Sequence, residues 1–163
     1  MELATTTLAA SDKSCSCIIV GIYEKGRQGV GAADINDASN GYLSKLVTSG
    51  DINGKPGTSR MLTSVPGIRA KRVLLVGLGK VDKFSIRYLR RATKIAADVV
   101  GDTKIRDVVS YLGLEEIPGV NSYYRARYTV ETICAALYSF NETKSGRRPP
   151  SPALKKVGLA IAS

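Results

Sequence analysis

The sequence predicts an α/β fold in which a largely parallel, mixed sheet is covered by helices on both faces. Short runs of β-branched and aliphatic residues, of which residues 72–79 (RVLLVGLG) are the clearest, alternate with segments whose apolar residues recur every three or four positions. Such alternation is typical of layered α/β domains, because each connection between parallel strands places a helix on one face of the sheet. The length, 163 residues, fits a single domain spanning residues 1–163.

Each predicted strand is a short apolar run bounded by turn residues, and each predicted helix is a longer stretch with one apolar face. Gly50 and Gly101 supply helix stops, and Pro66 closes one strand before the next begins. In order, the expected elements are a strand at 17–24, a glycine-rich loop at 25–34, a helix within 35–50, strands at 59–65 and 72–79, a helix at 82–101, a strand at 105–113, a helix at 121–145 and a strand at 154–163.

The apolar positions of the three helices predict which side chains reach the core. The first helix places three of them on one side, namely Leu43, Leu46 and Val47. The second helix forms one apolar face from Tyr88, Leu89, Ala92, Ile95, Ala96 and Val99. The last helix is expected to bury Tyr124, Tyr128, Ile133 and Leu137. A proline-rich linker at residues 146–152 (GRRPPSP) is expected to separate this helix from the final strand.

Composition argues against a self-contained hydrolase. The chain contains no histidine, so it lacks the commonest general base and the commonest metal ligand. Its three cysteines, Cys15, Cys17 and Cys134, lack the spacing of a zinc site and are expected to be reduced thiols. No apolar run approaches the ~20 residues of a membrane-spanning helix, and the N-terminus lacks the features of a secretory signal. A cytoplasmic protein without a membrane partner is therefore expected.

The strand at 72–79 runs into residues 77–80 (GLGK), a sequence that often opens a nucleotide-binding site. A dinucleotide fingerprint needs a third glycine where this chain has Asp82, and a Walker A loop needs a glycine where it has Leu74. The favoured interpretation is structural, with glycines that let a buried strand turn sharply and Asp82 capping the next helix. Glu115 and Glu116 are expected to be solvated. No catalytic, cofactor-binding or metal-binding residue is assigned.

Four cations lie on the polar face of the helix at 82–101 and form a basic stripe, Arg87, Arg90, Arg91 and Lys94. The whole chain carries a net charge of +10, which suits a polyanionic partner. Two interpretations stay open. The stripe is a solvated outer face, as most basic helix faces are, or it tracks the phosphates of nucleic acid, with DNA as the candidate partner.

Four segments follow one another in a characteristic order: GYLSKL at 41–46, DINGKPG at 51–57, VLLVGLGK at 73–80 and LYSFNETK at 137–144. In this order and spacing they resemble the N-terminal domain of the leucyl (cytosol) aminopeptidase family. The resemblance covers residues 17–163. It implies a three-layer α/β/α domain similar to macro domains, within a homohexameric two-metal enzyme that removes N-terminal residues, preferably leucine, from peptides.

In that family the zinc or manganese ligands and the catalytic lysine and arginine belong to a C-terminal catalytic domain. None of those motifs occurs in this chain, so the catalytic domain is expected to be absent here and to be the partner of a non-catalytic accessory domain that supports the hexamer. Two alternatives stay open. One is a nucleic-acid-binding module, since some bacterial members of the family bind DNA. The other is a macro-like domain that binds an ADP-ribose-type nucleotide at the Gly79 turn.

Overall fold

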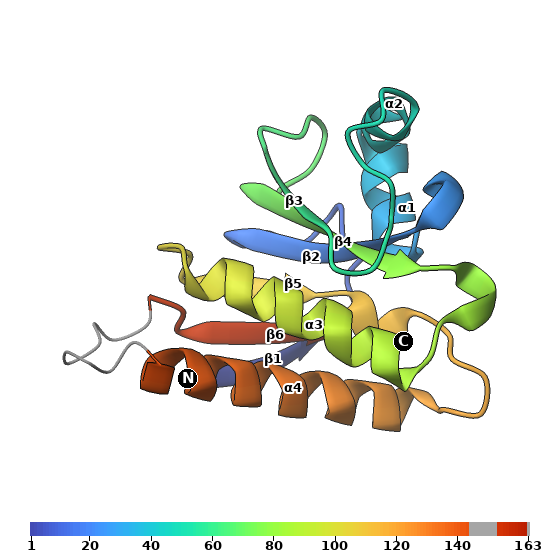
Figure 1. The fold of residues 1–163 in the computed structure, drawn as a ribbon. Helices are drawn as coiled ribbons and strands as arrows, with labels where there is room; N and C mark the ends of the chain where they lie inside the picture. The colour runs from blue at the N-terminus through green and yellow to red at the C-terminus, as the bar shows by residue number, and fades with distance from the viewer. Residues whose placement is uncertain (144–152, 163) are drawn as a thin grey trace.

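Six strands form one sheet with helices on both of its faces, as Figure 1 shows for this computed structural model, which describes residues 1–143 and 153–162. The strand order is β1-β6-β5-β2-β4-β3. Neighbouring strands run parallel, except that β3 is antiparallel to β4. The predicted fold class, a three-layer α/β/α domain with a largely parallel mixed sheet, is confirmed. The predicted linker at 146–152 lies outside the described residues.

The strands are β1 (Glu2–Thr6), β2 (Cys17–Tyr23), β3 (Ser59–Thr63), β4 (Arg72–Gly79), β5 (Asp107–Ser110) and β6 (Lys156–Ala160). The helices are α1 (Val30–Ala38), α2 (Tyr42–Thr48), α3 (Ile86–Gly101) and α4 (Ser122–Thr143). Three short 3-10 turns complete the described elements, at Glu24–Gly26, Val81–Lys83 and Leu112–Leu114. Among the helices that the structure describes, none has both the length and the hydrophobicity needed to cross a membrane.

Two apolar layers, one on each face of the sheet, hold the fold together. Alternate strand residues point to opposite faces, so Ile19 and Leu74 pack with α3 and α4, whereas Ile18 and Leu75 pack with α1 and α2. Strand β4 lies between β2 and β3, and every residue from Val73 to Gly79 is buried. The prediction of a strand buried on both faces at this position is confirmed.

The N-terminal part departs from the prediction in two places. Strand β1, which the sequence did not indicate, pairs in parallel with β6 at one edge of the sheet. Its alternation is weak because most of its residues are exposed. The glycine-rich loop predicted at 25–34 is also wrong in part, since α1 begins at Val30. Gly31, the second residue of this helix, has a packing reason: a Cβ there would lie 2.7 Å from both Val20 and Tyr111, so its absence lets the helix approach the sheet closely.

The single helix predicted within 35–50 is two helices, α1 and α2. Asn40 and Gly41 both have left-handed backbone conformations, with φ of 55° and 82°. This conformation ends a right-handed helix and reverses the chain, and Asn and Gly are the residues that adopt it most readily. The prediction weighed the apolar spacing of the segment and overlooked its Asn-Gly turn signal. Leu43 is fully buried as predicted.

Candidate functional site

The turn at the end of β4, the predicted candidate for a phosphate site, is packed against the chain's own loop before β3. The Gly79 N–H donates to the Gly54 carbonyl at 2.9 Å, and the Gly77 N–H donates to the Thr58 carbonyl at 2.9 Å. A Cβ at Gly77 would collide with the backbone carbonyl of Lys55. These glycines therefore permit two backbone segments to lie side by side, and the N–H groups of both glycines already have partners.

Gly79 adopts a φ of 85°, which non-glycine residues rarely reach. Its interpretation as the residue of a sharp turn is confirmed. The predicted capping role of Asp82 is wrong, because Asp82 lies in the exposed 3-10 turn and α3 begins four residues later, after Ser85. The delay has a packing reason. The intervening Phe84 is buried and meets the ring of Tyr23 edge to face, with centroids 5.5 Å apart.

Glu115 is the least expected residue of this region, because it is buried and not solvated as predicted. Only 3% of its surface is exposed. Its carboxyl accepts a hydrogen bond from the Tyr23 hydroxyl at 3.0 Å and another from the Val30 N–H at 2.7 Å. Val30 is the first residue of α1, so Glu115 satisfies a free N–H at the positive end of that helix. Its neighbour Glu116 is exposed, as predicted.

Burial dominates the electrostatics of this cluster. Loss of solvent raises the pKa of Glu115 above the ordinary glutamate value, and the hydrogen bonds from Val30 and Tyr23 oppose that rise. The charge of Arg125 also lowers the Glu115 pKa. Burial, followed by the nearby Glu115 carboxylate, raises the pKa of the Tyr23 hydroxyl. The cluster joins β2, α1 and the segment after β5, and its groups satisfy one another, so its role is to fix these elements together.

Arg125 explains how α4 lies on the sheet. Its guanidinium is buried and donates to the carbonyls of Gly113 and Val120 at 2.9 and 2.8 Å. The Thr129 hydroxyl donates to the Arg125 carbonyl one turn later. These polar residues occupy the inner face of α4, and the expectation that Tyr124 packs in the core is wrong, since 45% of Tyr124 is exposed. The hydrophobicity of tyrosine suggested burial, whereas Arg125 is needed to satisfy two carbonyls.

The basic stripe lies where the helical period predicts it. Its four side chains are exposed on α3, at Arg87, Arg90, Arg91 and Lys94. Within the described part of the chain, none of them forms an ion pair. The Arg90 guanidinium instead lies over the ring of Tyr128 in α4, 4.5 Å from its centroid. Cation–π contacts of this kind keep a guanidinium ordered without neutralising its charge.

A shallow groove of about 480 Å³ runs between α3 and α4 beside this contact. Three members of the stripe contribute one wall, and α4 contributes the other, so that the lining comprises Arg90, Arg91, Lys94, Glu131, Thr132, Ala135 and Ala136. Arg87 lies outside the groove. The structure thus brings three of the four predicted site residues together around one hollow.

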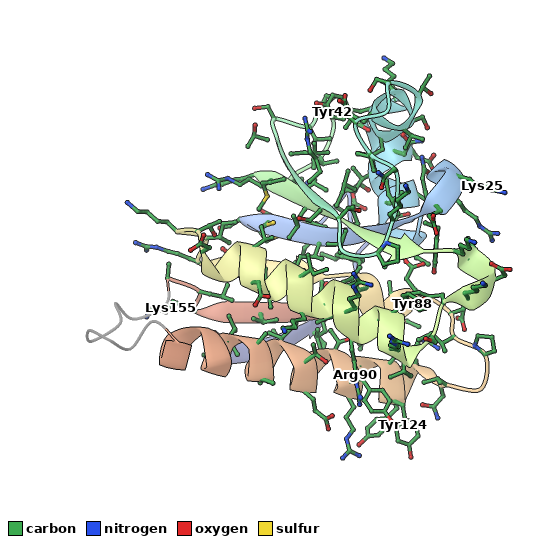
Figure 2. All side chains as sticks on the ribbon, in the orientation of Figure 1. Lys25, Tyr42, Tyr88, Arg90, Tyr124 and Lys155 are labelled. Atoms are coloured by element: carbon green, nitrogen blue, oxygen red, sulfur yellow. The ribbon has the colours of Figure 1, made fainter. Side chains whose placement is uncertain are left out.

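Three tyrosines extend this surface at the N-terminal end of α4. Tyr123 is 65% exposed and meets Tyr124 edge to face at 5.3 Å, and Tyr124 lies 6.4 Å from Tyr128. Figure 2 shows Arg90 and Tyr124 on the same outer side of the two helices. This cluster was not predicted from the sequence, although a Tyr-Tyr pair followed directly by Arg-Ala-Arg was a usable signal for it. In the described residues, no group of three or more His, Cys, Asp or Glu side chains could hold a metal ion.

Comparison with known proteins identifies the family. The profile described as "Cytosol aminopeptidase family, N-terminal domain" matches residues 19–147. The chain belongs to this family. Relatives include the probable cytosol aminopeptidases of Halorhodospira halophila, 34% identical over 161 residues (99% of this chain, 32% of the relative), and of Idiomarina loihiensis, 34% identical over 163 residues (100% and 32%). The chain spans about a third of the length of these curated relatives, and it corresponds to the N-terminal domain.

Solved structures agree on the fold of this cytosol aminopeptidase domain. A tomato leucine aminopeptidase variant superposes with a TM-score of 0.73 at 17% identity, covering 100% of this chain and 33% of that one. The Trypanosoma brucei macrodomain gives 0.64 at 16% identity, covering 98% and 61%. The macrodomain of Thermus aquaticus DarG gives 0.64 at 12% identity, covering 97% and 97%. The expected family and the expected macro-like fold are both confirmed.

Proposed function

We propose that this chain is the non-catalytic N-terminal domain of a metal-dependent leucyl aminopeptidase. The whole protein would remove N-terminal residues, preferably leucine, from peptides, with two zinc or manganese ions in a C-terminal catalytic domain. The single observation that carries the proposal is the match of residues 19–147 to the N-terminal domain of the family. The composition supports it, because a chain without histidine has few means of activating water by itself.

In the proposed enzyme this domain has an architectural role. Two metal ions would bind the substrate's amino end, polarise its carbonyl group and activate a water molecule, and these tasks need ligand sets that the described residues do not assemble. The domain would instead help to build the cytoplasmic homohexamer. Its buried contacts, such as those of Glu115 and Arg125, make it a stiff unit suited to this role.

A chimera tests the proposal directly. The N-terminal third of the Halorhodospira halophila relative is replaced by this chain, and leucyl-amide hydrolysis and particle size are measured with added Mn²⁺ or Zn²⁺. We expect the chimera to retain both properties, a deletion of the N-terminal third to lose the particle size, and the 163-residue chain alone to show no turnover above a mock purification. Metal-dependent turnover by the chain alone would place the active site in this domain and contradict the proposal.

A second candidate function, nucleic-acid binding, is favoured by the basic stripe on α3, whose cations form no ion pair with any residue that the structure describes. Four cations over two helical turns could displace several counterions from a phosphate backbone. Such contacts give affinity with little sequence preference. The test is the variant Arg87/Arg90/Arg91/Lys94→Ala, titrated with nucleic acid over a range of salt concentrations in the whole protein. If the stripe binds nucleic acid, the variant should have lower affinity and a shallower dependence of log affinity on log salt, with peptidase activity unchanged. An unchanged slope would mean that these residues form only a solvated face.

A further inference from the structure

The exposed tyrosines at the start of α4 call for a separate explanation, because they lie away from the inner face of the helix. That face is occupied by Arg125, Thr129 and Ile133. Tyr123 and Tyr124 fall outside it and leave much of their ring surface in solvent. Aromatic side chains that remain exposed and contact one another in a series form an apolar surface of a kind that marks interaction sites.

The charge around this tyrosine series is strongly positive. The exposed cations on the described parts of the same two helices are Arg87, Arg90, Arg91, Lys94 and Arg127. The Glu131 carboxylate in the groove accepts a hydrogen bond from Arg127 at 3.0 Å and so neutralises a cation outside the stripe. Arg90 reaches across from α3 and stacks on Tyr128, which joins the cationic stripe to the aromatic series. Aromatic and cationic groups therefore form one continuous surface.

We infer that this surface, formed by Tyr123, Tyr124, Tyr128 and the basic stripe, binds single-stranded nucleic acid. This inference rests on the second candidate function and specifies its ligand. Unpaired bases can stack on tyrosine rings while arginine and lysine side chains follow the phosphates. The bases of a duplex are stacked within the helix and cannot use the rings in this way, so a duplex would engage the cations alone.

The dimensions of the surface suit a short stretch of single strand. From Tyr124 to Ala135 the axis of α4 advances by about 17 Å, with the tyrosines at one end and the groove at the other. The groove continues the path because Arg91 and Lys94 line it. An isologous contact with a second copy of this chain would bring two sets of like charges together, which disfavours a self-interface here.

The experiment measures fluorescence anisotropy of labelled 12-nucleotide oligo(dT), oligo(rA) and a 12-base-pair duplex with the 163-residue chain at several salt concentrations. Tyr123→Ser/Tyr124→Ser removes both exposed rings, and Tyr123→Phe/Tyr124→Phe keeps them. We expect the chain to bind the single strands about tenfold more tightly than the duplex. The serine variant should lose about tenfold or more in affinity for the single strands without a change in salt slope, and the phenylalanine variant should bind like the wild type.

The variant Lys25→Ala/Lys45→Ala measures how far a lower net charge alone weakens oligonucleotide binding. Both exposed lysines lie with α1 and α2 at the other face of the sheet, away from the inferred surface. Duplex binding equal to single-strand binding, or a serine variant with unchanged affinity, overturns the inference and leaves the basic stripe as a nucleic-acid contact. Binding of neither form overturns the second candidate function as well. Displacement of the oligonucleotide by poly-glutamate at equal charge would assign the surface to acidic protein partners and would also contradict the inference.

Discussion

Removing the Glu115 carboxyl should destabilise the domain although the residue lies in a loop segment. In Glu115→Ala the Tyr23 hydroxyl and the Val30 N–H lose their acceptor in a buried place. An unsatisfied buried donor costs roughly 1–3 kcal/mol, so the two together cost roughly 2–6 kcal/mol. Relief from burying a carboxyl offsets part of this loss. We therefore expect a net loss of about 2 kcal/mol in the free energy of unfolding, or about 4–8 °C in Tm for a chain of this size.

The dependence on pH separates the carboxyl's charge from its shape. The Glu115 pKa is raised in the folded state, so the folded protein holds the proton to higher pH than the unfolded chain. The favourable contribution of Glu115 protonation to the free energy of unfolding is complete below the unfolded pKa of about 4.3. This contribution is lost as pH rises through the folded pKa. Glu115→Gln retains most of the shape without the charge. The stability of the wild type relative to this variant should therefore fall as pH increases above about 4.

Urea unfolding followed by circular dichroism from pH 4 to pH 8 measures both effects. Glu2→Gln is the control, since Glu2 is exposed in β1, away from the Glu115 cluster, and it should change the free energy of unfolding by less than about 0.5 kcal/mol. A Glu115→Ala variant as stable as the control, or a wild type that gains stability over Glu115→Gln as pH rises, would refute the assignment of Glu115 as a buried structural acid.

Three further substitutions test the packing. Leu75→Ala, at a position 2% exposed in β4, should lower the free energy of unfolding by roughly 2–5 kcal/mol in urea titrations; a loss under about 0.5 kcal/mol would contradict the buried strand. Gly31→Ala should destabilise by roughly 1–3 kcal/mol because its Cβ would press on Val20 and Tyr111, and a gain would mean that helix propensity outweighs the close contact. Thr93→Val should stabilise by about 1 kcal/mol in thermal unfolding, because the Thr93 hydroxyl is buried and has no hydrogen-bond partner among the described residues; a loss would point to a water molecule held there.

The layered fold was predictable because its signals are local. Strand β4 and helix α3 each carry a long, regular apolar pattern, and such patterns determine which side of an element is buried. Strand β1 was not predictable in this way. Its place in the sheet depends on pairing with β6, more than 150 residues away in the chain, and its own residues are mostly exposed. The split between α1 and α2 had a local signal in Asn40-Gly41, which the helical spacing of the flanking residues outweighed in the prediction.

In the candidate site, only the positions that follow from helical periodicity were predictable. The stripe residues of α3 fall on one side because residues three and four apart do so in any helix. The orientation of α4 depends on Arg125, whose guanidinium meets carbonyls from a preceding loop, and a contact of this kind has no sequence period. Tyr124 was therefore expected in the core, and the structure buries its neighbour Arg125 instead. The same applies to Glu115, since its partners Tyr23 and Val30 are distant in sequence.

The contacts at the glycine turn and at the start of α1 also bear on where a ligand could bind. The glycine turn after β4 is covered by the loop that contains Gly54, and the N–H of Val30 at the start of α1 already meets Glu115. A nucleotide at either place would have to displace contacts that stabilise the fold. The outer face of α3 and α4 imposes no such cost, because the cations of the basic stripe form no ion pair within the described residues and Tyr123 and Tyr124 are already exposed. A thermal-shift comparison should therefore show that oligo(dT) stabilises the domain and that ADP-ribose does not. If ADP-ribose stabilises the domain and Gly79→Ala abolishes this effect, the nucleotide binds at the glycine turn.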